Sequence, residues 1–179
     1  MKLPAAMVLL AGLLLAAASP GDEAAQKATA VAEKLAPPKG QAVLLKLKAA
    51  GVQIYECKPK PGQAGQFEWV LKAPEADLFD EEGKKVGKHY AGPTWEAKDG
   101  SKATAKLVEK APAPKDGDIP WLLLKATANE GGGVFSKVEY VQRVDTEGGV
   151  APAKADKAQE GKTVRVDYKA TYIFFATKK

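Results

Sequence analysis

One stretch of the chain holds most of the side chains that could do acid–base chemistry. His89 is the single histidine, and two carboxylates, Glu96 and Asp99, follow it closely. Imidazole titrates near neutral pH, so His89 is the natural general acid or base, and either carboxylate could orient it. Arg143, from a later segment, could hold an anionic substrate. These residues define one alternative function, a small enzyme of hydrolase or lyase type.

Aromatic side chains in and beyond this stretch favour binding instead. Tyr90 and Trp95 lie beside His89, Trp121 lies in a later apolar run, and flat rings of this kind stack on sugars or other flat ligands. With Arg143 they are the predicted binding residues. The structural alternative is a histidine bonded to backbone at a turn and aromatic rings packed in the core. One histidine and one cysteine make a poor zinc site, so no metal and no cofactor is expected.

The charge pattern argues against nucleic acid as a partner. Of the 27 basic residues only Arg143 and Arg165 are arginines, and the lysines are interleaved with acidic residues, which leaves a net charge of +5. Proteins that read nucleic-acid sequence rely on the planar arginine fork and on concentrated basic patches. The pattern is typical of a lysine-rich solvated surface.

The N-terminus predicts a secretory signal peptide over residues 1–18. Lys2 precedes an apolar core from Leu3 to Leu15, and small residues then support cleavage after Ala18. The apolar run is about 16 residues, shorter than a membrane-spanning helix needs. We therefore expect an exported protein, periplasmic or secreted, without a transmembrane segment after cleavage; an uncleaved anchor is the alternative. Cys57, the single cysteine, has no partner for an internal disulfide.

The mature chain changes its periodicity near residue 42. Residues 19–41 carry a thin apolar stripe of Ala28, Val31 and Leu35, which predicts a short helix or a tether. Alternating patterns then predict strands, because side chains on a strand point to opposite faces in turn. The predicted strands are 41–48 and 51–57, meeting near Gly51; 67–71, ending before Pro74; 103–110; 119–124; 134–144; and 163–175.

These strands lie close together in the chain and have different degrees of burial. The continuous apolar run 119–124 predicts a strand covered on both faces. The strand 134–144 is expected to carry Val138, Tyr140 and Val144 on one face and Arg143 on the other. Seven to ten short strands between Gly and Pro turns predict a single antiparallel all-β domain over residues 42–179, a sandwich or a barrel, with the sandwich preferred.

The most specific motifs of the chain lie in four segments, Gly51–Tyr55, Val86–Ser101, Ile119–Leu123 and Gln142–Pro152. In this order they resemble one family of exported proteins without established activity, the domain of unknown function (DUF) 3455 family. The resemblance implies a second cysteine in relatives shortly after the last segment. The nearest position here is Asp156, so a disulfide from Cys57 on that pattern is not available.

Taken together, these patterns predict an exported β-domain that binds an unknown small molecule or an envelope protein without catalysis. The enzyme using His89 is the first alternative, and an envelope structural protein without a small-molecule site is the second. The alternatives make different demands on geometry. A site requires the side chains of His89, Tyr90 and Trp95 to converge.

Overall fold

The computed structural model describes residues 20–178, so the predicted signal peptide and its cleavage site after Ala18 lie outside the described residues. One α-helix and eight strands follow one another, with a short 3-10 turn (Lys157–Gln159) before the last strand. The elements are α1 (Pro20–Lys34), β1 (Gln41–Pro59), β2 (Phe67–Phe79), β3 (Lys85–Tyr90), β4 (Thr94–Ala97), β5 (Lys102–Ala111), β6 (Trp121–Glu130), β7 (Tyr140–Gly148) and β8 (Thr163–Thr177).

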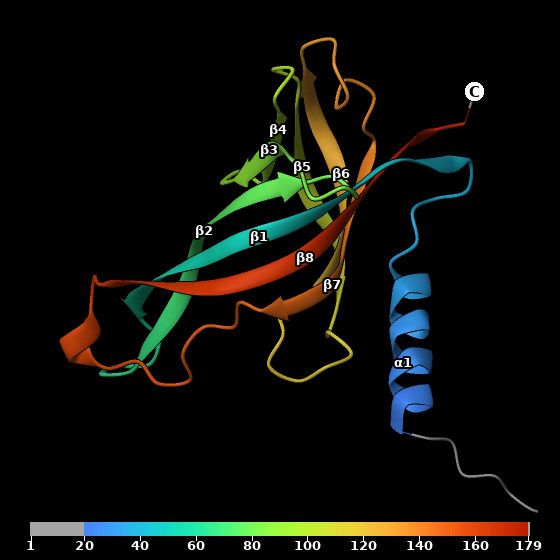
Figure 1. Ribbon diagram of the computed structural model, residues 1–179. Coiled ribbons are helices and arrows are strands. Elements are labelled where there is room, and N and C mark those ends of the chain that lie inside the picture. Colours follow the sequence, from blue (N-terminus) through green and yellow to red (C-terminus); the bar gives the residue numbers. More distant parts are fainter. Residues whose placement is uncertain (1–19, 179) are drawn as a thin grey trace, which may run out of the picture.

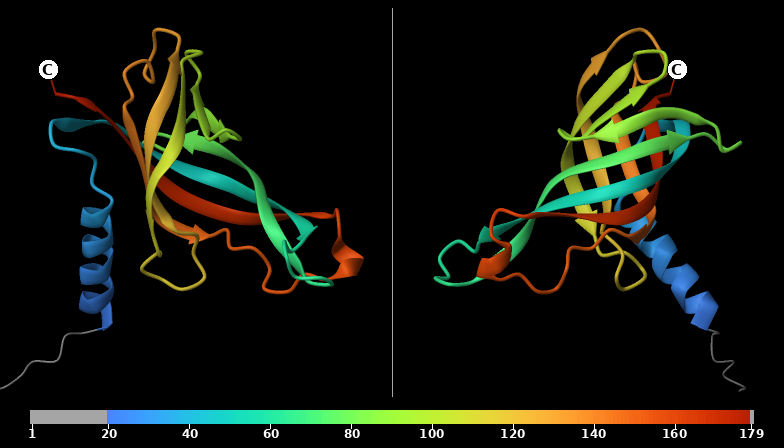
Figure 2. Two further views of the ribbon diagram at one scale, coloured as in Figure 1. Left: turned by 180° about the vertical axis from the view of Figure 1, so that it is seen from behind. Right: turned by 60° about the vertical axis from the view of Figure 1, so that its left-hand side comes forward.

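The strands form a closed antiparallel barrel in which each strand pairs with the next and β8 returns to β1. The β1–β8 ladder runs from Gln41 opposite Thr177 to Glu56 opposite Thr163, and it closes the ring seen in Figures 1 and 2. The expected antiparallel all-β domain is confirmed. Its architecture is the barrel and not the preferred sandwich, because the first and last strands pair along most of their length.

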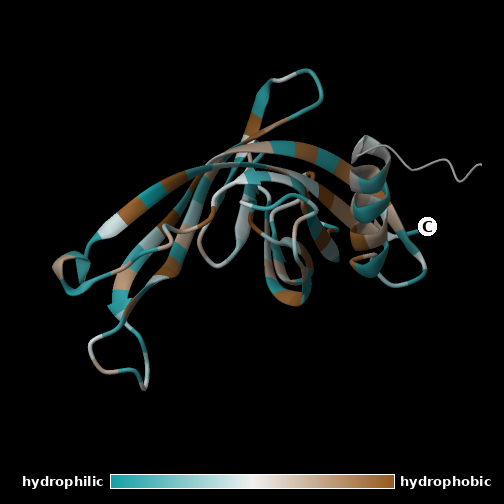
Figure 3. Cartoon of the chain, turned by 90° about the horizontal axis from the view of Figure 1, so that it is seen from below, coloured by the Kyte–Doolittle hydropathy of each residue, from teal (hydrophilic) through white to brown (hydrophobic). Residues whose placement is uncertain are grey.

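The inward faces of the strands form the main hydrophobic core. Apolar and polar residues alternate along the long strands, as the bands of colour in Figure 3 show. The predicted strand 163–175 is confirmed as β8, and its inward face carries Tyr168, Ala170, Tyr172 and Phe174, all of which are buried. Small alanines on the facing strands leave room for these large rings, which is how a narrow barrel fills its interior.

Helix α1 packs on the outside of the barrel (Figure 1). The predicted stripe of Ala28, Val31 and Leu35 contacts a second cluster that includes Trp121 and Leu123 of β6. The side-chain nitrogen of Gln142 donates to the backbone carbonyl of Leu35 over 3.1 Å, just after the end of the helix. The expectation that residues 119–124 are covered on both faces is therefore confirmed, since the helix covers the outer face of β6.

The structure corrects the predicted break near Gly51, because β1 continues through it as one strand. Gly51 pairs with Ala76 on one side and with Tyr168 on the other. A side chain at this position would collide with the backbone carbonyl of Glu75. The glycine therefore allows a close approach between two strands and does not mark a turn.

The structure also corrects the strand predicted over 134–144, which begins only at Tyr140. The preceding residues form turns, and their backbone N–H groups bond to side chains. Val134 N donates to the Asp99 carboxylate over 2.9 Å, and Phe135 N donates to the Ser101 hydroxyl over 3.1 Å. These bonds hold the segment against the β4–β5 turn and bury Phe135 in the core.

Strand β2 is longer than predicted because Pro74 lies within it. Proline cannot donate a hydrogen bond to a neighbouring strand, so it is tolerated where one side of a strand is unpaired. Residues 67–75 of β2 pair only with β1, whereas Ala76–Phe79 also pair with β3. The first part of β2 is thus a local edge inside a closed ring.

Strand β5 has a second local edge. Residues 102–104 pair with β4, but 106–111 pair only with β6. The short strands β3 and β4 connect β2 to β5 at one end of the barrel only (Figures 1 and 2). The wall of the barrel therefore has a lateral opening between the first part of β2 and the second part of β5.

Candidate functional site

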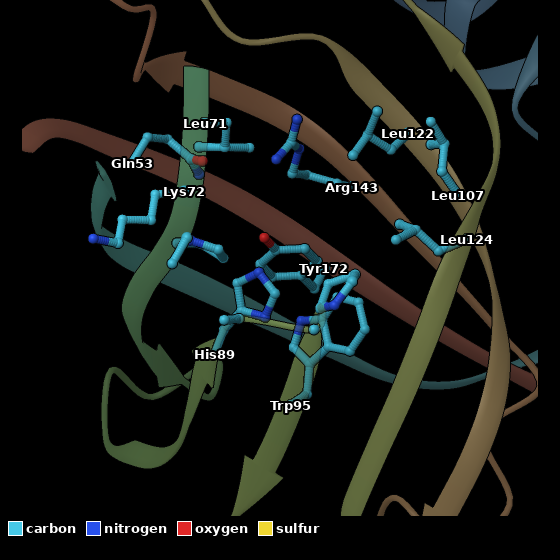
Figure 4. A pocket seen from close by; sticks show the side chains of 15 residues that line it. Gln53, Leu71, Lys72, His89, Trp95, Leu107, Leu122, Leu124, Arg143 and Tyr172 are labelled. Atoms are coloured by element: carbon cyan, nitrogen blue, oxygen red, sulfur yellow. The ribbon is translucent and has the colours of Figure 1, made fainter. Parts of the chain in front are cut away.

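A cavity of about 280 Å³ lies at this lateral opening. Its walls come from all eight strands and from the β3–β4 turn, and Figure 4 shows the labelled side chains that surround it. Leu71 of β2 and Leu107 of β5 stand on opposite rims, each about half exposed. The floor contains the buried side chains of Gln53, His89, Trp95, Leu124, Arg143 and Tyr172.

The β3–β4 hairpin places His89 and Trp95 side by side on the inward face. The two residues are direct cross-strand partners, and their rings stack with centroids 4.7 Å apart at an interplanar angle of 15°. The Trp95 ring also meets Tyr172 edge-on at 5.3 Å. These rings form a rigid aromatic base to the cavity, seen in the lower part of Figure 4.

The histidine is neutral at ordinary pH. The pKa of His89 is lowered from 6.5 to about 3, chiefly by burial and to a smaller extent by the charge of Arg143, against a hydrogen bond to Thr94 that raises it. The ring atom Nδ1 lies 2.9 Å from the carbonyl oxygen of Thr94, which can only accept, so Nδ1 carries the proton. His89 therefore offers an unprotonated Nε2, a hydrogen-bond acceptor that is a weak base.

The carboxylates named with His89 in the sequence do not contact it. Glu96 accepts a hydrogen bond of 2.7 Å from the Tyr90 hydroxyl and lies 3.4 Å from the ammonium of Lys88. This hydrogen bond and the nearby lysines lower the pKa of Glu96. Tyr90 is part of this partly exposed group and does not line the cavity.

Asp99 lies in the turn between β4 and β5, where its hydrogen bonds hold neighbouring segments together. Its carboxylate accepts from the Ser101 hydroxyl over 2.6 Å and from Val134 N. The hydrogen bonds from Ser101, followed by the one from Val134, lower the pKa of Asp99. The geometry thus gives His89 no carboxylate partner, and its Nδ1 is oriented by a backbone carbonyl.

The four predicted binding residues lie in three places, and Tyr90 is in the partly exposed group with Glu96. Trp95 and Arg143 both line the cavity, while Trp121 packs outside the barrel under helix α1. Arg143 was expected on the face of β7 opposite Val144, and it is. That face points into the barrel, because helix α1 covers the Val144 side.

Two cavity residues, Gln53 and Tyr172, were missed by the sequence interpretation. Gln53 is 2% exposed, and its side-chain nitrogen has no hydrogen-bond partner among residues 20–178. It shares a face with the buried Tyr55 and Cys57, so the alternation of this strand could have marked it as a buried amide. A buried unpaired polar group of this kind is costly unless something binds it.

Cys57 is buried and free, as expected for a chain with one cysteine. Its sulfur lies 3.7 Å from the backbone oxygen of Asp156. Burial, followed by the negative charges of Asp156 and Glu160, raises the pKa of the thiol. The position where the family resemblance implies a second cysteine therefore adjoins Cys57 in space.

The fold and the site define the class of this protein: a closed eight-stranded antiparallel barrel whose interior is only partly filled by side chains. The chain belongs to the family described as Protein of unknown function (DUF3455), whose model matches residues 37–176. This confirms the resemblance found from the four motifs. Among curated proteins, none matches the chain. Within residues 20–178, no helix is long and apolar enough to cross a membrane, and no three potential metal-ligating side chains form a cluster.

Proposed function

We propose that the protein is a binding module that takes one small, largely apolar molecule into the barrel through the lateral opening. The cavity is the observation that carries this proposal. It has an apolar lining, reaches the buried Trp95–His89 stack, and is open to the surface between Leu71 and Leu107. Eight-stranded barrels have an interior just wide enough for side chains or for one small ligand.

The geometry supports binding better than acid–base catalysis. A general acid or base works best with a pKa near the working pH, and the pKa of His89 is about 3. The same residue has a role in a binding site, since its stacked ring supports Trp95 and its Nε2 can accept one hydrogen bond.

Thermal unfolding in the presence of small molecules tests the proposed binding. A suitable panel holds eight- to twelve-carbon acids, alcohols and amines with straight or aromatic bodies. A ligand at a hundred times its dissociation constant stabilises by about 2.7 kcal/mol. For a domain of this size, we expect the unfolding midpoint to rise by roughly 5–10 °C.

Two variants of equal added bulk separate binding in the cavity from binding elsewhere. Ala73 lines the cavity, whereas Ala128 is exposed on β6 away from it. We expect Ala73→Phe to reduce the ligand-induced shift and Ala128→Phe to leave it unchanged. A shift that is equal in both variants, or no shift with any compound, would contradict this function and favour a protein partner or a structural role.

We also propose that the protein is exported, with residues 1–18 removed. The support is the sequence pattern of a short positive start, an apolar core and small residues before Ser19. The intact mass of the protein recovered from its own cells tests this, because an export signal predicts a mature chain that begins at Ser19. A chain that retains residues 1–18 would contradict cleavage.

A further inference from the structure

The guanidinium of Arg143 is a buried positive charge at the cavity. The side chain is 9% exposed and takes part in none of the ion pairs among the described residues. Its Nε and Nη2 atoms both donate to the carbonyl oxygen of Pro120, over 3.2 and 2.8 Å. The Tyr172 hydroxyl is a further polar neighbour of the guanidinium, and it carries no charge. A carbonyl dipole neutralises no net charge.

This charge cannot be removed by loss of a proton. His89, a few side chains away in the same cavity, stays neutral because burial lowers its pKa to about 3. Arginine keeps its proton at every pH that proteins tolerate, so Arg143 remains cationic where it lies. An isolated buried charge is strongly unfavourable, and an anion bound in the cavity would compensate for it.

Two more donors at the same cavity lack partners. The side-chain nitrogen of Gln53 and the indole Nε1 of Trp95 are both buried without a hydrogen-bond acceptor among residues 20–178. Both residues line the cavity together with Arg143. Unsatisfied donors outnumber acceptors here, and such a surface favours a ligand rich in acceptor oxygens.

The formal charges that line the cavity are positive. Among residues 20–178, the lining contains two basic side chains, Arg143 and Lys72, and no Asp or Glu. Lys72 is exposed at the rim, where its ammonium lies 3.6 Å from Glu56 outside the cavity. The interior is thus left with the single positive charge of Arg143. A ligand with one negative charge would balance it.

The rest of the lining is apolar and limits the size of the ligand. Leu122 and Leu124 of β6 and Leu107 of β5 gather on one side of the cavity in Figure 4, away from Gln53. An apolar cavity of about 150 Å³ holds one benzene molecule. On that scale, a cavity of about 280 Å³ holds roughly ten to twelve heavy atoms.

We propose that the ligand is an amphipathic monocarboxylate of about this size, with its carboxylate on Arg143 and its apolar body against Leu122 and Leu124. The planar guanidinium fork matches a carboxylate, and charge-assisted hydrogen bonds of this type are the strong ones. The Gln53 amide can donate to the same head group. This assignment rests on the proposed function and names the ligand class for that cavity.

Calorimetric titration of the purified protein with three eight-carbon molecules tests the charge requirement. The probes are octanoate, 1-octanol and octylamine, which share a chain and differ in the head group. Hydrogen bonds to charged groups contribute about 1.5–3 kcal/mol each. We therefore expect octanoate to bind at least about tenfold more tightly than 1-octanol, and octylamine to bind most weakly.

Substitution of the two arginines of the chain tests the assignment to Arg143. We expect Arg143→Met to weaken octanoate binding by tenfold or more and to leave 1-octanol binding unchanged or stronger. The control is Arg165→Met, because Arg165 is exposed and pairs with Glu75 on the surface. That variant should bind octanoate like the unmodified protein. Arg143→Lys should be intermediate, since it keeps the charge but loses the fork.

The outcomes distinguish this assignment from the function on which it rests. Binding of 1-octanol as tight as that of octanoate, in the unmodified protein, would overturn the carboxylate assignment and leave a binding barrel. Octanoate binding that is unaffected by Arg143→Met would do the same. Failure of all three probes, together with no stabilisation by any compound of the larger panel, would overturn both. The comparison of head groups in the unmodified protein remains informative even if a variant fails to fold.

Discussion

His89 lies in an environment that resists its protonation. In the folded protein its pKa is about 3, because it is buried beside the cation Arg143, while an unfolded chain gives histidine a pKa near 6.5. As the pH falls below about 6.5, the unfolded state takes up a proton that the folded state refuses. The folded state is therefore destabilised progressively between pH 6.5 and pH 3, and is unaffected by this group above that range.

We expect protonation of His89 in the unfolded state to lower the free energy of unfolding by roughly 2 kcal/mol between pH 7 and pH 5. Urea unfolding at the two pH values, in the unmodified protein and in His89→Gln, measures it. The acidic side chains titrate alike in both proteins, so the difference between them isolates His89. An equal loss of unfolding free energy in the variant would contradict the assignment of this pH dependence to His89. Because His89 is the single histidine, NMR titration of its imidazole gives the pKa directly.

The candidate site shows what residue types alone can predict. His89, Trp95 and Arg143 are rare residue types in this chain, and all three line the cavity. Tyr90 and Glu96 were chosen for their closeness in sequence, and they lie elsewhere. The turn between β3 and β4 pairs His89 with Trp95 and Lys88 with Glu96, which puts these two pairs on opposite faces. Only the register of that hairpin separates the two sets, and composition does not determine a register.

At the scale of the elements, helix α1 stabilises the barrel from outside. Leu35, just after the helix, is fully buried against Trp121, Leu123 and Val144, although these strand residues point away from the barrel interior. The helix thus supplies the second layer that a hydrophobic outer face needs. Its own apolar stripe is thin, so its order depends on this contact more than on helix propensity.

We expect Leu35→Ala to lower the free energy of unfolding by about 2–4 kcal/mol, as large-to-small changes in cores do. Trp121 should become exposed, with a red-shifted emission relative to the unmodified protein. Denaturant unfolding followed by fluorescence measures both effects. Val134→Ala is the matched control, because Val134 is about half exposed in a turn, and we expect it to change stability little. Equal effects of the two variants would contradict a docked helix.

The elements that the sequence predicted well are those whose alternation had no interruption. Strand β8 follows its pattern closely, whereas two bulges interrupt the alternation of β5, although its bounds lie within one residue of the prediction. The burial of residues 119–124 on both faces was indicated by a continuous apolar run. The failures occurred where tertiary contacts override local signals. Gly51 resembles a turn but serves a close strand approach, and the Val134 segment alternates but bonds to Asp99. Neither contact lies within the range of a local pattern.

At the scale of the whole molecule, closure of the ring and the lateral opening have the same origin in strand length. Strands β1 and β8 are long and pair with each other almost throughout, whereas β3 and β4 are too short to extend the β2–β5 connection along the barrel. No local pattern in the sequence indicates this, because the length of a paired ladder depends on partners far away in the chain. The opening leaves backbone groups of β2 and β5 without strand partners on one side.

Hydrogen exchange should reveal this opening as an uneven protection pattern. Amides paired on both sides open only with large parts of the structure, whereas outward-facing amides of an edge exchange readily. We expect slow exchange in residues 48–56 of β1 and 168–175 of β8, which pair on both sides, and much faster exchange in residues 67–75 of β2 and 106–111 of β5. Residues 76–79 provide the control within β2, because they pair on both sides. Deuterium uptake of overlapping peptides, followed by mass spectrometry, measures the pattern.

A bound ligand should change exchange at this opening more than anywhere else. Residues 71–74 and Leu107 line the cavity, so saturating octanoate should slow uptake in the peptides that contain them and leave the β1–β8 ladder as it was. Uniform protection of both halves of β2 in the free protein would mean that the wall is closed in solution. Slowing that is spread evenly over the barrel would place the ligand elsewhere. Faster exchange at the two edges, reduced locally by the ligand, is the pattern that a barrel filled from its side requires.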